Sequence, residues 1–444
     1  MRILIISPHF PPVNAPDMHR VRLLIPHFVE AGVEIEVLTV EASQATYPSD
    51  PQLMANLPSC VPIHRVRALG LHWRRFPGLG SIGFRSLRAL ARRGDTLLAE
   101  RHFDLIYFST TVFEVHWLGV RWNRKFGIPF MMDFQDPWVN DYYRKHPHIR
   151  PPGGRLKYGL MNLLHRWMEP RVLRQCSGII SVSPAYPVQL AQRYPWLEIT
   201  DTNPDGTSLG SRLHLPARVM PFPGDSCDLD EVVRSNASQS LFKPDDGRIH
   251  WVYAGVFIPG MIGTLRALFE ALQKHASNAL LDRLQIHFIG TSYVPGSAPV
   301  IPHVAREYGL ERLVDEKPGR VTYTEVLACL RDANALLVLG SNDAGYTASK
   351  VYPYLLARKP LLAIMHQSSS VVTLMSKVRG SVCVPFSNTS SQKETAMAIR
   401  EQWLKNDRWQ SAVQLDEMAF QPYTAKYQAR ELADFFQTVV PQTT

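Results

Sequence analysis

Short runs of apolar residues recur along this chain, and a stretch of helical periodicity follows each of them. The first run, ILIIS at 3–7, is separated from EIEVLTV at 34–40 by a proline-rich loop and by a segment at about 17–31 whose apolar residues recur every three or four positions. Runs that are apolar throughout are typical of strands buried on both faces of a parallel sheet. A strand, a helix and a second strand within about forty residues form a βαβ unit, so the sequence predicts an α/β fold.

The pattern occurs in two series. The first continues through the runs at 104–109, 130–134 and 178–182 and ends in a short strand at Val219, and the second has runs at 249–254, 285–289, 335–339 and 361–364. Because 444 residues are too many for one core, we expect two domains. We predict a Rossmann-like domain at 1–224, a polar linker at 225–247, a second Rossmann-like domain at 248–420, and a C-terminal helix at 421–444 that packs back toward the first domain.

The charge of the chain is unevenly distributed. Residues 1–222 contain 26 Lys and Arg against 17 Asp and Glu, whereas residues 223–444 contain 22 of each, so the net charge of +9 lies in the first half. Such a one-sided basic surface favours an anionic partner. Two Arg-rich segments contribute most: 64–93 has eight arginines and no acid, and 150–174 has six basic residues and one acid.

Apolar residues alternate with the basic ones in both Arg-rich segments, which is typical of helices that lie on anionic membranes. We therefore predict peripheral contact with a membrane surface; the alternative is that each helix packs its apolar side on the sheet. No recognisable nucleic-acid module accompanies the charge, so nucleic acid is not an expected partner.

The cysteines and the start of the chain limit its environment. The five cysteines are widely spaced, without a CxxC pair, which favours reduced thiols and no metal site. MRILIIS is too short for a signal peptide, and no apolar run reaches the roughly 18 residues that a membrane span needs. We expect a cytoplasmic protein with peripheral contact at the inner face of the membrane.

The stretch TASKVYPYLLARKPLLAIM at 347–365 is predicted to be a loop, a helix ended by Pro360, and a buried strand. Thr347, Ser349 and Lys350 stand where the helix begins. A helix start offers free backbone N–H groups and a partial positive charge, which suit a phosphate. The alternative is that the hydroxyls only cap the helix and the lysine is solvated.

Five motifs occur in order along nearly the whole chain: MRILIISPHFPP, GIPFMMDFQDPW, VMPFPGD, VYAG and SKVYPYLLARKPLLAI. Together they resemble GT-B-fold glycosyltransferases of the family 4 type (group 1), which are nucleotide-sugar-dependent and retaining. Proteins of this kind mostly build bacterial surface polysaccharides. The resemblance implies that two doubly wound Rossmann-like domains face each other across a cleft, with the donor on the C-terminal domain and the acceptor on the N-terminal one.

The implied reaction transfers a sugar from a nucleotide-sugar donor to a hydroxyl of a lipid-linked or surface-polysaccharide precursor, with retention. The nucleotide sugar is a co-substrate, and no other cofactor and no metal are expected. Lys350 would neutralise the donor diphosphate, and Asp133 and Asp136, just after a buried strand, would position the acceptor. The implied donor-binding residues are Gly255, Arg320, Val321, Asp343, Tyr346, Thr347, Ser349, Lys350 and Arg20.

The chain departs from the family pattern near this lysine. Two glutamates, eight positions apart, are usual there, but this chain has Gly345 and Pro353, and Arg358 replaces a usual glycine. Two alternatives therefore stay open: a nucleotide-sugar 2-epimerase on the same fold, and a catalytically impaired glycosyltransferase-like binding protein.

Overall fold

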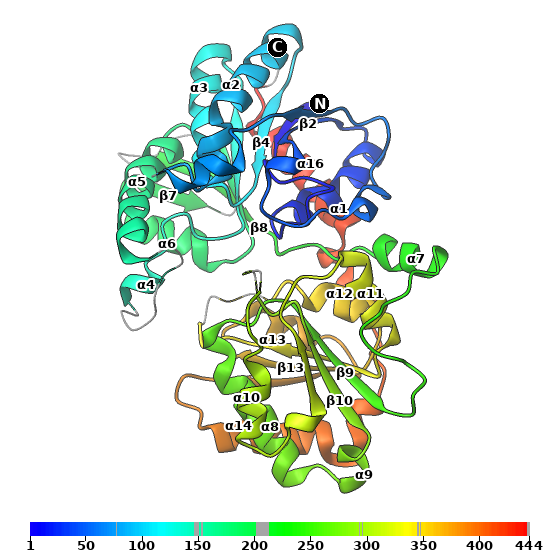
Figure 1. The fold of residues 1–444 in the computed structure, drawn as a ribbon. Helices are drawn as coiled ribbons and strands as arrows, with labels where there is room; N and C mark the ends of the chain where they lie inside the picture. Colours follow the sequence, from blue (N-terminus) through cyan, green and yellow to red (C-terminus); the bar gives the residue numbers. More distant parts are fainter. Residues whose placement is uncertain are drawn as a thin grey trace. The chain divides into compact units, whose positions relative to one another are not determined.

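The computed structural model describes residues 1–76, 78–145, 151, 154–200, 213–292, 294, 296–343, 346 and 348–441, without the side chains of 142, 145, 200 and 406. The chain forms two compact units (Figure 1). Unit 1 consists of Met1–Pro221 and Ala425–Thr444, and unit 2 consists of Phe222–Thr424. No helix within the described ranges is both long and apolar enough to cross a bilayer.

Unit 1 is built on an eight-stranded sheet whose paired strands are all parallel. The strand order β3-β2-β1-β4-β5-β6-β8-β7 reverses direction between β1 and β4, as in a doubly wound fold. The strands are β1 Arg2–Ile6, β2 Glu34–Val40, β3 Ile63–Val66, β4 Leu105–Ser109, β5 Phe130–Phe134, β6 Gly178–Ser181, β7 Leu197–Thr200 and β8 Leu213–Val219.

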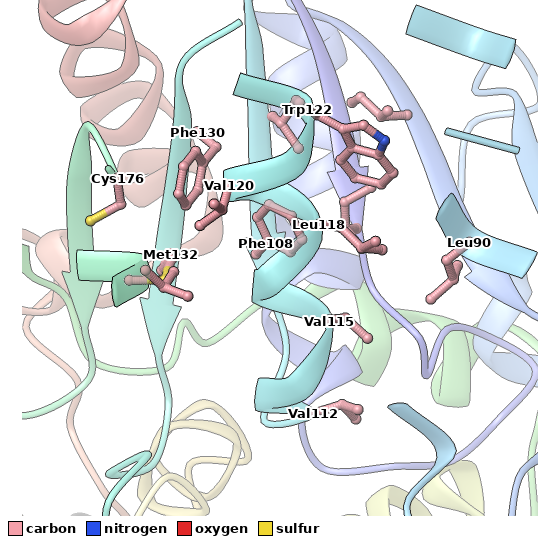
Figure 2. Packing of buried hydrophobic residues seen from close by; sticks show 14 of the residues in the cluster. Leu90, Phe108, Val112, Val115, Leu118, Val120, Trp122, Phe130, Met132 and Cys176 are labelled. Carbon is pink, nitrogen blue, oxygen red and sulfur yellow. The ribbon is translucent and has the colours of Figure 1, made fainter. Parts of the chain in front are cut away.

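Helices pack on both faces of this sheet. The main ones are α1 Met18–Glu30, α2 Ile82–Glu100, α3 Trp117–Phe126, α4 Tyr142–Lys145, α5 Arg155–Leu173, α6 Ala185–Arg193 and α16 Ala425–Val439, with short 3-10 turns η1 Ala42–Gln44, η2 Pro51–Met54, η3 Leu71–Arg75 and η4 Phe113–His116. The C-terminal helix α16 lies beside α1, where Phe436 packs against Phe28 and Tyr107. On the other face Trp122 of α3 stacks on Phe108 of β4 (Figure 2).

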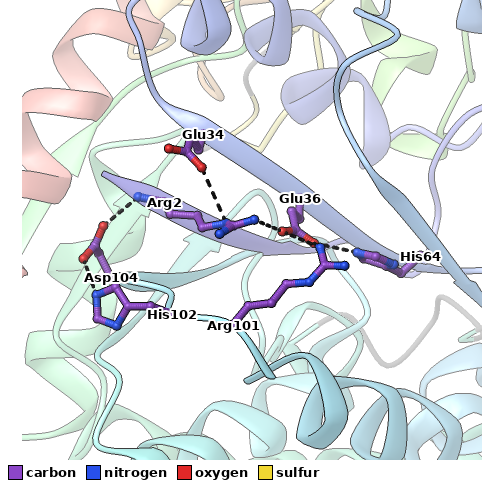
Figure 3. Close-up of polar contacts among 7 residues, drawn as sticks. All are labelled: Arg2, Glu34, Glu36, His64, Arg101, His102 and Asp104. Atoms are coloured by element: carbon purple, nitrogen blue, oxygen red, sulfur yellow. Dashed lines mark hydrogen bonds and ion pairs between the residues drawn. The ribbon is translucent and has the colours of Figure 1, made fainter. Parts of the chain in front are cut away.

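A buried carboxylate joins the first three strands near their amino ends (Figure 3). Glu36 of β2 is 2% exposed and binds Arg2 at 2.8 Å, His64 at 2.7 Å and Arg101 at 2.9 Å. Burial alone would raise the pKa of Glu36, but the hydrogen bonds from His64 and Arg101 hold it below its ordinary value. This network stabilises the sheet at the amino ends of its strands, opposite the edge formed by their carboxyl ends.

Unit 2 repeats the design with six parallel strands in the order β11-β10-β9-β12-β13-β14. They are β9 Ile249–Ala254, β10 Leu284–Ile289, β11 Val314–Lys317, β12 Ala335–Leu339, β13 Leu361–His366 and β14 Val382–Phe386. The helices are α7 Cys227–Arg234, α8 Ile262–His275, α9 Asn278–Leu281, α10 Ile301–Arg306, α11 Tyr323–Asp332, α12 Val351–Leu356, α13 Ser370–Met375, α14 Gln392–Ile399 and α15 Glu417–Phe420. Short turns are η5 Pro259–Met261, η6 Glu311–Leu313, η7 Arg400–Leu404, η8 Lys405–Gln410 and η9 Gln421–Tyr423.

Two segments differ from their predicted form. The stretch expected to be an irregular linker contains α7, whose Val232 is 1% exposed and packs in the core of unit 2. The helix expected to run to Pro360 ends at Leu356, because Arg358 adopts a left-handed backbone conformation with φ of +54°. A left-handed residue ends an α-helix in this position, and glycine is the usual residue there.

Candidate active site

The first part of the site lies at the carboxyl ends of the central strands of unit 2. The strand order reverses between β9 and β12, and ligands of doubly wound sheets bind at such a switch point. Gly255 follows β9 directly, and its N–H donates to the carbonyl of Ile289 on β10 at 2.8 Å. Its φ of +129° lies in a region that residues with a Cβ rarely adopt.

Lys350 is the residue directly before α12, and its side chain extends to this switch point. Its Nζ lies 3.8 Å from the ring centroid of Tyr253, a cation–π contact. A Cβ on Gly255 would lie 2.6 Å from that Nζ, so the missing side chain makes the space for the amine. The sequence alone indicated Gly255 and Lys350 separately, and the structure brings them into contact.

The amine of Lys350 is buried, and among the described residues it has no polar partner. Its Nζ accepts or donates no hydrogen bond among the described residues. Burial lowers the pKa of Lys350 to about 7, because a charged ammonium loses its hydration there. A bound anion would supply the missing partner and restore the charge, so the arrangement is suited to a phosphate group.

Tyr354 holds α12 against the end of β9. Its hydroxyl accepts from the N–H of Ala254 at 2.7 Å and donates to the carbonyl of the same residue at 3.1 Å. Since Tyr354 lies one helical turn after Lys350, these two hydrogen bonds fix the position of the lysine. A local sequence pattern does not reveal this polar role of Tyr354, because its partner lies 100 residues away.

The other predicted donor residues of unit 2 differ in their exposure to solvent. Ser349 and Asp343 are exposed, and Tyr346, Arg320 and Val321 are partly buried. Ser349 does not cap α12, which has six residues and no side-chain cap. Thr347 and Gly345 lie outside the described residues.

In unit 1 Arg20 and Asp133, both named as candidate site residues, form a buried ion pair. Arg20 is 0% and Asp133 1% exposed, and the Nε of the arginine lies 2.9 Å from Oδ2 of the aspartate. Arg20 also donates to the carbonyl of Met220 at 2.6 Å, and Gln135 donates to Asp133 at 3.0 Å. This buried ion pair joins α1, β5 and the end of β8.

Asp136 remains the accessible carboxylate after β5. Its side chain is exposed, yet the surrounding protein desolvates it and, with the negative charge of Asp17, raises its pKa to about 6. Asp17 itself is buried and accepts from His9 Nδ1 at 3.0 Å and from Thr110 at 2.8 Å. Asp136 is therefore largely ionised at neutral pH and can accept a hydrogen bond from a hydroxyl group.

A cavity of about 240 Å³ opens in unit 1, where residues that follow β1 and β4 contribute to its wall. Its polar lining includes Glu114, whose Oε2 accepts from Ser81 at 3.1 Å and whose Oε1 lies 3.7 Å from His165 Nε2. Sequence analysis missed this group, because Glu114, Ser81 and His165 come from three distant segments. The remaining wall is formed by His9, Thr46, Tyr47, Gly80, Ile82, Arg85, Thr111, Val112 and Phe113.

The Arg-rich segment at 64–93 includes the first part of α2. There Arg85 is 3% exposed and donates to the carbonyls of Leu69 and Gln44. Arg88 and Arg92 remain exposed. Within the described ranges, no three His, Cys, Asp or Glu side chains gather in a way that could hold a metal ion.

Residues 19–196 match the protein family described as "Glycosyl transferase 4-like domain". The matched range includes α1 to α6, Asp136 and the cavity residues Glu114 and His165. The match lies within unit 1. No curated protein matches the chain.

Solved glycosyltransferase structures match nearly the whole chain. HepE from Anabaena in complex with UDP and glucose is 12% identical, with coverage of 99% of this chain and 100% of that chain and a TM-score of 0.56. A UDP-forming α,α-trehalose-phosphate synthase from Burkholderia xenovorans in complex with glucose-6-phosphate is 11% identical, with coverage of 98% and 100% and a TM-score of 0.61. WaaG, a glycosyltransferase involved in lipopolysaccharide biosynthesis, is 11% identical, with coverage of 99% and 100% and a TM-score of 0.55.

At these identities the likeness shows the fold. The chain has the GT-B fold, with two Rossmann-like, doubly wound parallel-sheet domains, and this confirms the predicted fold class.

Proposed function

We propose that this chain is a glycosyltransferase that moves a sugar from a nucleotide-sugar donor to a hydroxyl of a lipid-linked or surface-polysaccharide precursor, with retention of anomeric configuration. The observation that carries the proposal is the buried amine of Lys350, which is unpaired among the described residues and lies at the switch point of unit 2. The family match within unit 1 supports it, as does the fold shared with a structure of HepE solved in complex with UDP-glucose.

Lys350 would bind the diphosphate of the donor. As the bond between the sugar carbon and the diphosphate oxygen breaks, negative charge develops on the departing nucleoside diphosphate. A fixed cation in a site that excludes water stabilises that charge more than it would in bulk solution. Gly255 allows this contact because it leaves room for the amine.

Unit 1 would bind the acceptor. The cavity beside Glu114, Ser81 and His165 offers hydrogen-bond donors and acceptors of the kind that hydroxyl groups of a sugar require. Asp136, ionised at neutral pH, would accept a hydrogen bond from the attacking hydroxyl. The exposed arginines of 64–93 and 150–174 would hold the protein at an anionic membrane, the surface on which a lipid-linked acceptor is found.

One observation favours a second candidate, a binding protein that has lost turnover. Pro353 lies inside α12, in the position where the resemblance places a donor-binding glutamate. Proline supplies no carboxylate and no N–H to a ligand. Such a protein would bind nucleotide sugars through Lys350 without transferring them.

The test is a panel of nucleotide sugars incubated with the purified chain, with and without lipid extracts as acceptors and in the presence of EDTA. Hydrolysis or transfer supports the proposal, whereas isomerised sugar without acceptor indicates a 2-epimerase and binding without turnover indicates the binding protein. Lys350→Met should abolish most turnover, and Lys377→Met, which removes an exposed lysine of the same unit, is the matched control. Equal activity in the two variants would remove Lys350 from the site.

A further inference from the structure

Helix α5 presents a stripe of large apolar side chains to solvent. Leu156 is 91% exposed, Leu160 60%, Leu163 66% and Trp167 47%. Their spacing of four, three and four residues places them on one face of the helix. Leu156 is the most exposed large apolar side chain among the described residues, so this stripe is not part of the packed core.

The other side of α5 is anchored firmly. Met168, Val172 and Leu173 are buried in the core of unit 1. Glu169 is 0% exposed and accepts from Arg193 and from the hydroxyl of Tyr194, each at 2.7 Å. The exposed stripe therefore belongs to a helix that is held in place by its opposite face.

A second exposed apolar element precedes a segment that meets the start of α5. Leu71 and Trp73 of η3 are 42% and 37% exposed, and the following Phe76 is 43% exposed. The loop after η3 meets α5 at Gly80, where a Cβ would lie 2.8 Å from Nζ of Lys157. This loop and α5 also line the same cavity in unit 1.

The charges beside this surface are positive. Lys157 and Arg171 are exposed on α5, Arg174 is exposed directly after it, and Arg74 and Arg75 are exposed on η3. The acidic residue of α5, Glu169, is buried in its ion pair with Arg193, and the nearby Asp141 is paired with Arg166 at 2.5 Å. A second copy of the surface would bring like charges together, whereas an anionic bilayer supplies negative charge and an apolar interior at once.

We propose that the exposed stripe of α5, together with η3, inserts into an anionic lipid leaflet. The leucines and Trp167 enter the boundary of the acyl chains, while Lys157 and Arg171 contact lipid phosphates. The proposed membrane contact is therefore apolar as well as electrostatic. It is centred on α5 and not on α2, where Arg85 is buried. This inference rests on the proposed function in one respect: it assigns the adjoining cavity to a membrane-bound acceptor.

The test measures binding of the full chain to vesicles of phosphatidylglycerol and phosphatidylcholine, and to vesicles of phosphatidylcholine alone. The double variant Leu160→Ser/Leu163→Ser should weaken binding to the anionic vesicles by at least tenfold. Met418→Ser, which removes an apolar side chain 85% exposed in unit 2, is the matched control and should bind like the unaltered chain. Equal binding of the double variant and the control would overturn the proposal.

A fluorescent label reports insertion directly. Cys60→Ser and Cys227→Ser remove the two exposed cysteines, and an environment-sensitive dye is then placed at Leu160→Cys or, as the control, at Met418→Cys. Anionic vesicles should shift the emission of the dye to the blue at position 160 and not at position 418. A bound protein without that shift would contradict insertion.

Self-association is the competing occupant of the stripe, and sedimentation without lipid detects it. A dimer that the double variant dissociates would overturn the membrane assignment. Donor binding should be the same in the double variant and the unaltered chain. Vesicle binding with no transfer to any acceptor would therefore contradict the proposed function and support this inference. Transfer without vesicle binding would contradict this inference and support the proposed function.

Discussion

Donor binding at Lys350 should take up a proton from solution. The pKa of Lys350 is lowered to about 7 in the free protein because of burial, and a bound diphosphate should raise it toward the ordinary lysine value of about 10.4. The diphosphate of a nucleotide sugar is itself fully ionised at neutral pH. The proton count of binding therefore reports the state of one amine.

The expected magnitude follows from the two pKa values. At pH 8 a group of pKa 7 is protonated in about a tenth of the free molecules, so binding should take up about 0.9 proton per donor. At pH 6 the amine is already charged and uptake should be about 0.1 proton. Donor affinity should be constant below pH 7 and fall by about tenfold for each pH unit above it, because charging the lysine then opposes binding.

Titration calorimetry in buffers of different ionisation enthalpy measures this uptake. Lys350→Met should show no uptake at either pH and should bind the donor roughly 10- to 150-fold more weakly at pH 6, since a charge-assisted contact is worth about 1.5–3 kcal/mol. Lys377→Met should behave like the unaltered chain. Uptake near zero at pH 8 in the unaltered chain would refute the reasoning that the lysine is neutral before the anion arrives.

Further outcomes follow from other residues. Gly255→Ala should displace the Lys350 amine and weaken donor binding, as measured by calorimetry, because the new Cβ would lie 2.6 Å from Nζ; unchanged affinity would mean that the contact is unimportant. The donor kcat/KM should follow a bell-shaped pH profile between pKa values of about 6 and 7, and Asp136→Asn should remove its acidic limb. Asp133→Asn should destabilise the protein by about 3–5 kcal/mol in urea unfolding, because the buried Arg20 loses the carboxylate 2.9 Å from its Nε; a loss under 1 kcal/mol would contradict the ion pair. Burial lowers the pKa of His116 to about 4, so stability should fall by up to about 3 kcal/mol as pH drops from about 6.5 to 4, and His116→Asn should flatten that dependence.

The central strands were predicted well from the sequence, because strands buried on both faces consist mainly of apolar residues. The runs at 34–40, 130–134, 249–254 and 335–339 have the bounds of β2, β5, β9 and β12. The strands β3, β7, β11 and β14 were not predicted. Each lies at an edge of its sheet, and polar residues interrupt the pattern in some of them, as in VDEK of β11. An edge strand needs fewer apolar side chains, so its periodicity is weak.

The sequence indicated Lys350 at the start of a predicted helix and Gly255 after a predicted strand. It does not reveal the ring of Tyr253 beneath the amine, which lies 97 positions earlier in the chain. The resemblance implied Arg20 as a donor-binding residue, and Asp133 was chosen because it lies near the carboxyl end of a buried strand. A local pattern does not reveal that two such residues neutralise each other, since they lie 113 positions apart.

The most direct test of this account is a structure of the chain with an intact nucleotide sugar bound. We predict that oxygen atoms of the diphosphate lie about 3 Å from Nζ of Lys350, beside Gly255 at the carboxyl end of β9. A donor whose diphosphate binds elsewhere, with the Lys350 amine still without an anion, would contradict it.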